Sequence, residues 1–141
     1  MYRFSTLGLS ALVMTWFTLA VVGLGAQNPG GSAEGKAMKN PVAANTASVS
    51  AGMALYQKNC QFCHGPKGLG DGPLAPKDTM PANLTDATWV RGSTDGEIFK
   101  VISEGAGPDF KMKGVKGRLS DNDIWNLVNY LRSIGPKTAS R

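Results

Sequence analysis

The sequence predicts an all-α domain made of a few short helices joined by long loops. Apolar residues recur at helical spacing in three stretches, residues 50–64, 93–105 and 119–135, as expected for helices that bury one face. Residues 65–84 are so rich in glycine and proline that neither a helix nor a strand ladder can continue through them. No run of alternating apolar and polar residues predicts a strand. Helices this short gain most of their stability from packing, so they need a shared core.

The first predicted helix leads into the motif CQFCH. Met53, Tyr56 and Cys60 follow one another at intervals of three and four residues and therefore share a helical face. Ser48 or Ser50 is available as the N-cap. We expect the helix to begin at about residue 50 and to end at the motif.

The other two helices carry signals at both ends. Ser93 or Thr94 can cap the middle helix, Glu97 completes a capping box with Thr94, and a glycine ends the helix after residue 104. Ser120 can cap the last helix, with acidic residues in its first turn and Arg132 in its last, before a Gly-Pro stop. Its predicted apolar stripe consists of Ile124, Leu127, Val128 and Leu131.

The N-terminal part of the chain differs from this central region. Leu7–Ala26 is an uncharged apolar run that is typical of a secretory signal and is also long enough for a membrane anchor, so residues 1–26 are interpreted as one or the other. Residues 27–48 lack apolar periodicity and are expected to form a flexible linker. The domain should then cover residues 49–135, followed by a C-terminal tail, residues 136–141. We expect the domain to be exported to the periplasm, with a tether to the inner membrane if the anchor is kept.

Composition limits the class of protein. The chain has 141 residues, 42% of them hydrophobic, and a net charge of +5, which fits one globular domain. Its basic residues are scattered and lack the aromatic interleaving of a nucleic-acid surface, so nucleic-acid binding is not expected.

The motif Cys60 to His64 holds both cysteines and the only histidine of the chain. Cys60, Cys63 and His64 stand at i, i+3 and i+4, so on a helical turn they project from one face. Cys-x-x-Cys-His is the attachment pattern of a c-type haem, in which the two thiols bond the vinyl groups and the imidazole coordinates the iron. A covalent haem c is therefore the expected cofactor, and it would complete the core of a domain of this size.

Three other readings of the motif are weaker. A thioredoxin-type redox pair would need a βαβ context, which the sequence lacks. A zinc site needs four ligands, and no further cysteine or histidine exists. A structural disulfide between Cys60 and Cys63 would close a small loop of little stabilising value and leaves His64 unexplained.

The sixth iron ligand has to be a methionine, because there is no second histidine. Met112 lies far enough after His64 for its loop to reach the opposite face of the porphyrin, whereas Met80 lies in the proline-rich loop close to the motif. We predict His64 and Met112 as the axial ligands, with Met80 as an apolar wall of the pocket. Two protein ligands leave no vacant site, so such a haem passes single electrons rather than activating a substrate, and no enzyme activity is expected.

From residue 52 to residue 132 the sequence resembles the class I monohaem c-type cytochromes of the bacterial periplasm. The resemblance rests on the motifs GMALYQKNCQFCHG, GLGDGPLA, PANLTD, TDGEIFKVISEG and LSDNDIWNLVNYLR and on a loop that carries a methionine. It implies a small cytochrome c fold, with short helices and long loops wrapped around one covalently bound haem.

The resemblance also implies particular contacts. Gly52 and Tyr56 of the first helix would pack across the last helix at Leu127 and Tyr130. The Pro73 region would lie against the His64 side and fix the imidazole through its backbone, and Trp89 would line the haem or reach a propionate. In many relatives a proline follows the ligand methionine, whereas Lys113 follows Met112 and Pro81 follows Met80.

Four cations lie close to Met112 in the sequence: Lys111, Lys113, Lys116 and Arg118. If Met112 is a ligand, they would ring the haem edge and attract an acidic redox partner; the alternative is a loop that charge merely keeps soluble. We expect a monomer that carries electrons between periplasmic or membrane-bound redox proteins. A fixed haem subunit of a dehydrogenase or oxidase complex is the alternative, and a peroxidase or gas sensor with a labile methionine is a third reading.

Overall fold

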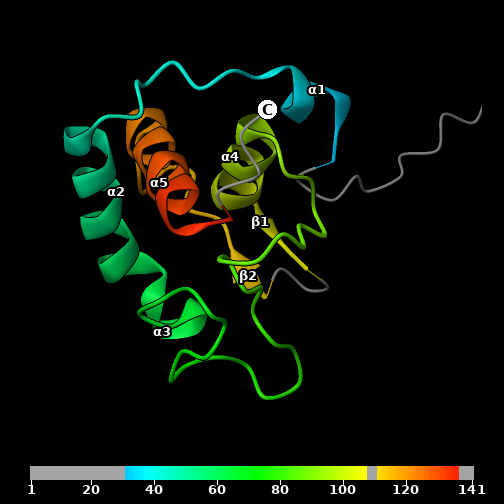
Figure 1. Ribbon diagram of the computed structural model, residues 1–141. Helices are drawn as coiled ribbons and strands as arrows, with labels where there is room; N and C mark the ends of the chain where they lie inside the picture. Colours follow the sequence, from blue (N-terminus) through cyan, green and yellow to red (C-terminus); the bar gives the residue numbers. More distant parts are fainter. Residues whose placement is uncertain (1–30, 108–110, 137–141) are drawn as a thin grey trace, which may run out of the picture.

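The structure is a computed structural model that describes residues 31–107 and 111–136. The predicted signal or anchor, residues 1–26, lies outside these ranges, as do residues 137–141 of the predicted tail. The elements in chain order are α1 (Ala33–Ala37), α2 (Thr46–Asn59), α3 (Gln61–His64), α4 (Asp95–Glu104), β1 (Gly105–Ala106), β2 (Met112–Lys113) and α5 (Asp121–Ile134). Figure 1 shows the three longer helices, α2, α4 and α5, gathered around a shared core. None of the helices in the described ranges is both long and apolar enough to cross a membrane.

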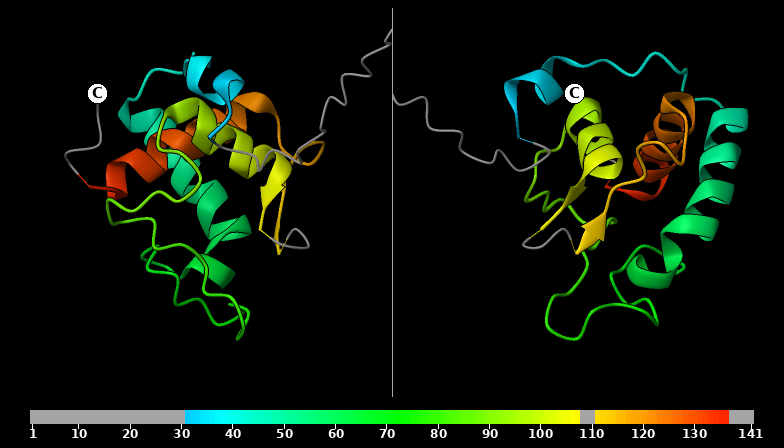
Figure 2. Two further views of the ribbon diagram at one scale, coloured as in Figure 1. Left: turned by 90° about the vertical axis from the view of Figure 1, so that its right-hand side faces the viewer. Right: turned by 180° about the vertical axis from the view of Figure 1, so that it is seen from behind.

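The α2 and α5 helices form the central contact of the fold and lie side by side in all views (Figures 1 and 2). Gly52 is what allows them to approach: a Cβ added there would lie 2.1 Å from the carbonyl oxygen of Asn126 on α5. One turn later, the Tyr56 ring meets the Tyr130 ring at a centroid distance of 5.2 Å. The crossing expected from the family resemblance, Gly52 and Tyr56 against the last helix, is therefore present.

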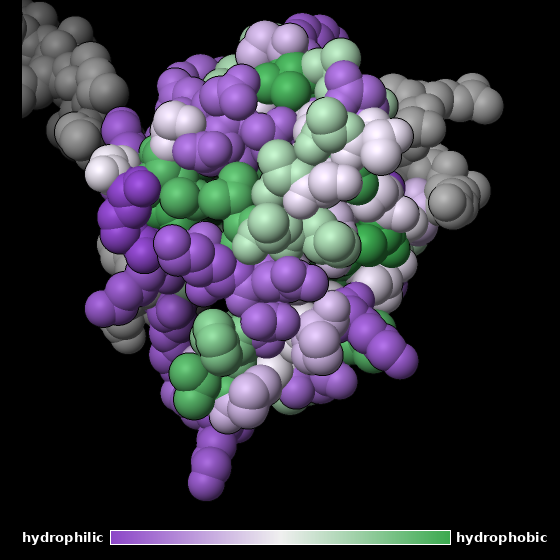
Figure 3. Space-filling view, turned by 90° about the vertical axis from the view of Figure 1, so that its left-hand side faces the viewer, coloured by the Kyte–Doolittle hydropathy of each residue, from purple (hydrophilic) through white to green (hydrophobic). Residues whose placement is uncertain are grey.

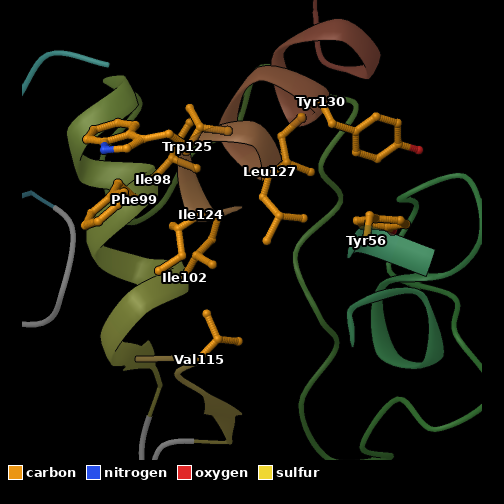
Figure 4. Close-up of a cluster of buried hydrophobic side chains, with 11 residues drawn as sticks. Tyr56, Ile98, Phe99, Ile102, Val115, Ile124, Trp125, Leu127 and Tyr130 are labelled. Carbon is orange, nitrogen blue, oxygen red and sulfur yellow. The ribbon is translucent and has the colours of Figure 1, made fainter. Parts of the chain in front are cut away.

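The α4 helix packs on the other side of α5. Figure 4 shows Ile98 and Ile102 of α4 facing Ile124 of α5, and the Phe99 ring stacks on the Trp125 indole at 4.3 Å. All four predicted stripe residues of α5 are buried. The complete buried cluster consists of Tyr56, Ile98, Phe99, Ile102, Val115, Ile124, Trp125, Leu127, Val128, Tyr130 and Leu131.

The N-terminal caps of α4 and α5 are those that the sequence predicts, whereas the start of α2 differs from the prediction. Capping boxes are present at Thr94 with Glu97 and at Ser120 with Asp123. The α2 helix begins earlier than predicted, at Thr46, with Asn45 as the N-cap. Ser48, a predicted cap, lies inside the helix and is buried, because its hydroxyl bonds to Asn126 of α5 instead of to an exposed helix end.

The all-α prediction is confirmed, with one small addition. The two-residue strands β1 and β2 pair antiparallel, with Ala106 opposite Met112. Strands this short carry no alternation that a sequence could reveal. Their effect is to hold the Met112 segment against the end of α4.

Residues 31–48 differ from the flexible linker that the sequence predicts. Gly35 of α1 lies against Glu97, and Lys100 of α4 pairs with Glu34 at 2.9 Å. Further along, the Asn40 amide donates to the Asn129 side chain of α5 at 2.8 Å. Met38 and Val42 also pack against the buried cluster, but they form no periodic apolar stripe, so hydrophobic periodicity does not predict that this segment is docked.

Candidate haem site

The predicted attachment motif forms a single tight turn after α2. The backbone N–H groups of Cys63 and His64 both donate to the carbonyl of Cys60, at 3.1 and 3.0 Å. The Tyr56 hydroxyl donates to the carbonyl of Gly65 at 2.6 Å and so ties the end of this turn back to α2. Cys63 and His64 therefore lie on α3, and Cys60 caps its N-terminal end.

The His64 side chain is held in one orientation by a backbone carbonyl. The residue is buried, and its Nδ1 atom lies 3.0 Å from the carbonyl oxygen of Ala82. A carbonyl can only accept a hydrogen bond, so Nδ1 carries the proton and Nε2 keeps a free lone pair. Burial lowers the pKa of the imidazole, against the opposing effect of the Ala82 hydrogen bond, which favours the neutral form that binds metal.

The glycine-rich loop after α3 places the Ala82 carbonyl. Gly70 donates its N–H to the carbonyl of His64 at 2.8 Å, and Leu84 donates to Gly68 at 2.7 Å. Gly70 has a φ of +85°, and a Cβ there would lie 2.4 Å from the carbonyl oxygen of Pro81. Only glycine combines this backbone conformation with so close an approach.

The role that the sequence analysis gave to the Pro73 region belongs to Ala82. Pro73 is exposed and lies between Gly72 and Leu74, whose N–H groups bond to the backbone of Cys63 and Phe62. No sequence signal pointed to Ala82, because its contribution comes from a backbone carbonyl that any residue could supply. That the Pro73 region lies against the His64 side of the haem stays a prediction.

Both cysteines are free thiols in the structure. Burial raises the pKa of the Cys60 thiol to about 11, with a further contribution from Cys63, so this thiol is protonated at neutral pH. Cys60 packs against the buried cluster, whereas the Cys63 sulfur faces the loop near the carbonyl of Leu74. The two sulfurs are therefore positioned by different parts of the fold.

The two candidate methionines lie in contrasting environments. Met112 is partly buried on β2 and packs against the hydrophobic cluster. Met80 lies in the loop after α3 with 77% of its surface exposed. The contrast favours Met112 as the axial ligand, and the assignment stays a prediction.

Trp89 is partly buried against the same cluster, with the Arg132 guanidinium 5.8 Å from the centre of its ring. Its Nε1 atom is buried and has no hydrogen-bond partner among the described residues. An indole N–H can only donate, and a buried donor without an acceptor costs free energy. A haem propionate would supply that acceptor.

Large apolar side chains are exposed on α3 and in the loop that follows it. Phe62 lies on α3, and the loop carries Leu69, Leu74 and Met80. Figure 3 shows the α2 side of the molecule, where patches of hydrophobic residues are separated by hydrophilic ones. Exposed apolar side chains concentrated in one loop indicate a surface that something else covers.

These observations fit a haem at the attachment turn. A c-type haem uses two thiols, which bond its vinyl groups, and an imidazole that coordinates the iron, and these residue types are all present at this turn. The exposed apolar side chains of α3 and the following loop suit the porphyrin ring, and the contact of Trp89 with a propionate stays a prediction. Fold and site together define a c-type cytochrome domain.

Sequence comparison places the domain in a family. Residues 47–131 match the model of cytochrome C oxidase, cbb3-type, subunit III, and the chain belongs to this family. A covalently attached haem c is the cofactor that goes with it. The resemblance to class I c-type cytochromes is thereby confirmed.

Individual relatives carry the names of oxidase subunits. The chain is 32% identical over 91 residues to the cbb3-type cytochrome c oxidase subunit FixP of Azorhizobium caulinodans, covering 64% of this chain and 29% of that protein. It is 30% identical over 97 residues to subunit CcoP of Rhodobacter capsulatus, covering 65% and 31%. The matched region thus spans less than a third of the length of these relatives.

Solved structures support the fold. A Kuenenia stuttgartiensis reducing HAO-like protein complex matches with a TM-score of 0.61 and 23% identity, covering 70% of this chain and 50% of that one. Cytochrome cL of Methylophaga aminisulfidivorans matches with a TM-score of 0.54 and 23% identity, covering 67% and 61%. At this identity the likeness concerns the fold alone.

Proposed function

We propose that the chain is a single-electron transfer domain with one haem c, bonded through Cys60 and Cys63 and ligated by His64 Nε2 and Met112 Sδ. The haem supplies an iron that cycles between Fe(II) and Fe(III). A thioether ligand favours the reduced state, and two protein ligands leave no coordination site for a substrate. We therefore propose electron transfer without substrate turnover.

The observation that carries this proposal is the orientation of His64. Its Nδ1–H is committed to the Ala82 carbonyl at 3.0 Å, which leaves Nε2 as the only ring nitrogen able to bind a metal. A histidine serving only as core would have no reason to be preceded by two free thiols in the same turn. Hydrogen bonds from the Gly70 N–H to the His64 carbonyl and from the Tyr56 hydroxyl to the Gly65 carbonyl hold the backbone at this histidine.

The domain could transfer electrons as a diffusible carrier or as a fixed haem subunit of a complex, and the relatives favour the fixed subunit. Their names are those of cbb3-type oxidase subunits, which supports a fixed haem subunit of an oxidase complex over a diffusible carrier. In that setting the domain would pass electrons to or from other subunits of one membrane complex. The spectroscopic experiment below applies to both settings.

Location and docking follow from the same proposal. Export through residues 1–26, with Leu7–Ala26 as signal or membrane tether, would place the haem domain in the periplasm. The cations flanking Met112 are exposed and would meet an acidic surface on a redox partner. We propose that the isolated chain is a monomer.

The test is a visible and near-infrared spectrum of the exported holoprotein, oxidised and reduced, for the wild type and for Met112→Ala. The proposal expects a sulfur-to-iron band in the wild type that Met112→Ala loses, together with new binding of carbon monoxide. Met80→Ala is the matched control and should leave both unchanged. One haem per chain should be found from the iron and protein contents.

Other outcomes are equally informative. If Met80→Ala removes the band, the ligand assignment is wrong and electron transfer stands. If the wild type binds carbon monoxide readily, the iron has a labile site, and the peroxidase or sensor reading replaces electron transfer.

A further inference from the structure

We propose that Lys111 is a positioning residue for the axial methionine: it ties the loop after α3 to strand β2 and so holds Met112 on the iron. Lys113, on the other side of Met112, stays available for a partner. This inference rests on the proposed His64/Met112 ligation.

The tie consists of two contacts from one ammonium group. Lys111 Nζ donates to the Thr79 hydroxyl at 2.9 Å and forms an ion pair with the Asp78 carboxylate. The hydrogen bond with Lys111 lowers the pKa of Asp78, which keeps the carboxylate charged. These partners lie more than thirty residues earlier in the chain than Lys111. In Figure 1 the loop that carries them runs below the molecule between α3 and β2.

Other contacts of the Met112 segment come from α4 and the buried cluster: β2 pairs with β1, the N–H groups of Val115 and Lys116 donate to the carbonyls of Ile102 and Ser103, and Met112 packs against the cluster. Among the hydrogen bonds and ion pairs of the described residues, those of Lys111 are the ones that join this segment to the loop after α3. Lys111 directly precedes Met112, so movement of Lys111 away from the loop would move the methionine as well. A tie at this point opposes withdrawal of the thioether from the iron.

The two lysines that flank Met112 differ in their contacts. Within residues 31–107 and 111–136, Lys111 has Asp78 and Thr79 as partners, whereas no ion pair or side-chain hydrogen bond is found for Lys113. The Lys111 side chain is 30% exposed. Because the Asp78 carboxylate already balances its charge, Lys111 contributes less than Lys113 to attracting an acidic partner.

Competition by imidazole measures how firmly Met112 is held. Added imidazole displaces a methionine ligand from Fe(III), and the loss of the sulfur-to-iron band reports the binding. We compare the holoprotein with Lys111→Ala, Asp78→Ala, the double variant and Lys113→Ala. Lys113→Ala is the matched control, since it removes the same charge at the same distance in sequence from Met112.

Lys111→Ala and Asp78→Ala should each raise the apparent imidazole affinity about two- to fivefold, the size of effect that one exposed ion pair has. The imidazole affinity of the double variant should be close to that of each single variant, because both single substitutions remove the same interaction. Lys113→Ala should match the wild type in imidazole affinity and lose more of the salt-dependent electron-transfer rate with an acidic partner than Lys111→Ala does.

Equal imidazole affinities for Lys111→Ala and Lys113→Ala, or additive effects in the double variant, would overturn the tie. If the Met112→Ala variant keeps the sulfur-to-iron band of the wild type, the ligand assignment on which the tie rests is wrong instead. The two failures are thus separated by a single variant.

Discussion

The side-chain amides of Asn129 on α5 and Asn40 before α2 share a hydrogen bond of 2.8 Å. The Asn129 amide nitrogen also donates to the Val42 carbonyl at 3.1 Å and to the Ser48 hydroxyl at 2.8 Å. One buried side chain therefore links α5 to both the segment before α2 and the first turn of α2. This explains why residues 38–48 are docked although they contain no apolar stripe.

Asn129→Ala should lower the free energy of unfolding of the holoprotein by about 1–3 kcal/mol, because it leaves buried partners without a hydrogen bond. Urea unfolding followed by tryptophan fluorescence measures the change. Asn122→Ala, at an exposed position of the same helix, should stay within about 0.5 kcal/mol of the wild type. Equal effects of the two substitutions would mean that the network adds nothing to stability.

Gly52→Ala tests the crossing of α2 and α5. The new methyl carbon would lie 2.1 Å from the Asn126 carbonyl oxygen and 2.8 Å from the Tyr130 Cβ, and backbone atoms in a helix cannot move aside cheaply. Alanine stabilises a helix by about 1 kcal/mol relative to glycine. The sign of the change in unfolding free energy therefore shows whether the clash or the helix propensity is the larger effect. We expect a net loss of about 1–3 kcal/mol or more from the clash.

Urea unfolding of the holoprotein measures that loss. Ser50→Ala, at an exposed position on the same helix, is the control and should change stability by less than about 0.5 kcal/mol. A stabilised Gly52→Ala protein would show that the helices separate without cost and that the close approach is unimportant.

Sequence reasoning succeeded where local chemistry dictates the outcome. The capping box at Thr94, the cap at Ser120 and the stripe of α5 are encoded within one or two helical turns. Cys60 and His64 lie on one turn, as their spacing predicts, because the His64 N–H donates to the Cys60 carbonyl. Long-range polar contacts could not be predicted in this way, because the Asn40 to Asn129 hydrogen bond joins residues 89 positions apart. The Ala82 carbonyl could not be predicted either, because a backbone acceptor leaves no residue type to recognise.

Tyr56→Phe tests the tie between α2 and the haem-attachment turn. It removes only the hydroxyl that donates to the Gly65 carbonyl at 2.6 Å and keeps the ring packed on Tyr130. We expect a loss of about 0.5–1.5 kcal/mol in urea unfolding, the usual value of one hydrogen bond. Tyr130→Phe is the matched control, since its hydroxyl makes no hydrogen bond in the described part of the chain, and its loss should be smaller. The reverse order would refute this role of the Tyr56 hydroxyl.

The lowered pKa of Glu97 predicts how the stability of the fold changes at acidic pH. Burial opposes ionisation of this carboxyl, yet hydrogen bonds from the Thr94 backbone and hydroxyl outweigh burial and lower its pKa from the usual 4.5. A carboxyl whose pKa is lower in the folded state stabilises the fold above its unfolded pKa, and this contribution disappears as the pH falls through the folded value. Glu97→Gln cannot ionise and should therefore lose less stability than the wild type between about pH 5 and about pH 3 in urea unfolding of the holoprotein. Parallel losses in the two proteins would assign the acid sensitivity to other carboxylates and show that the capping box holds equally well when Glu97 is neutral.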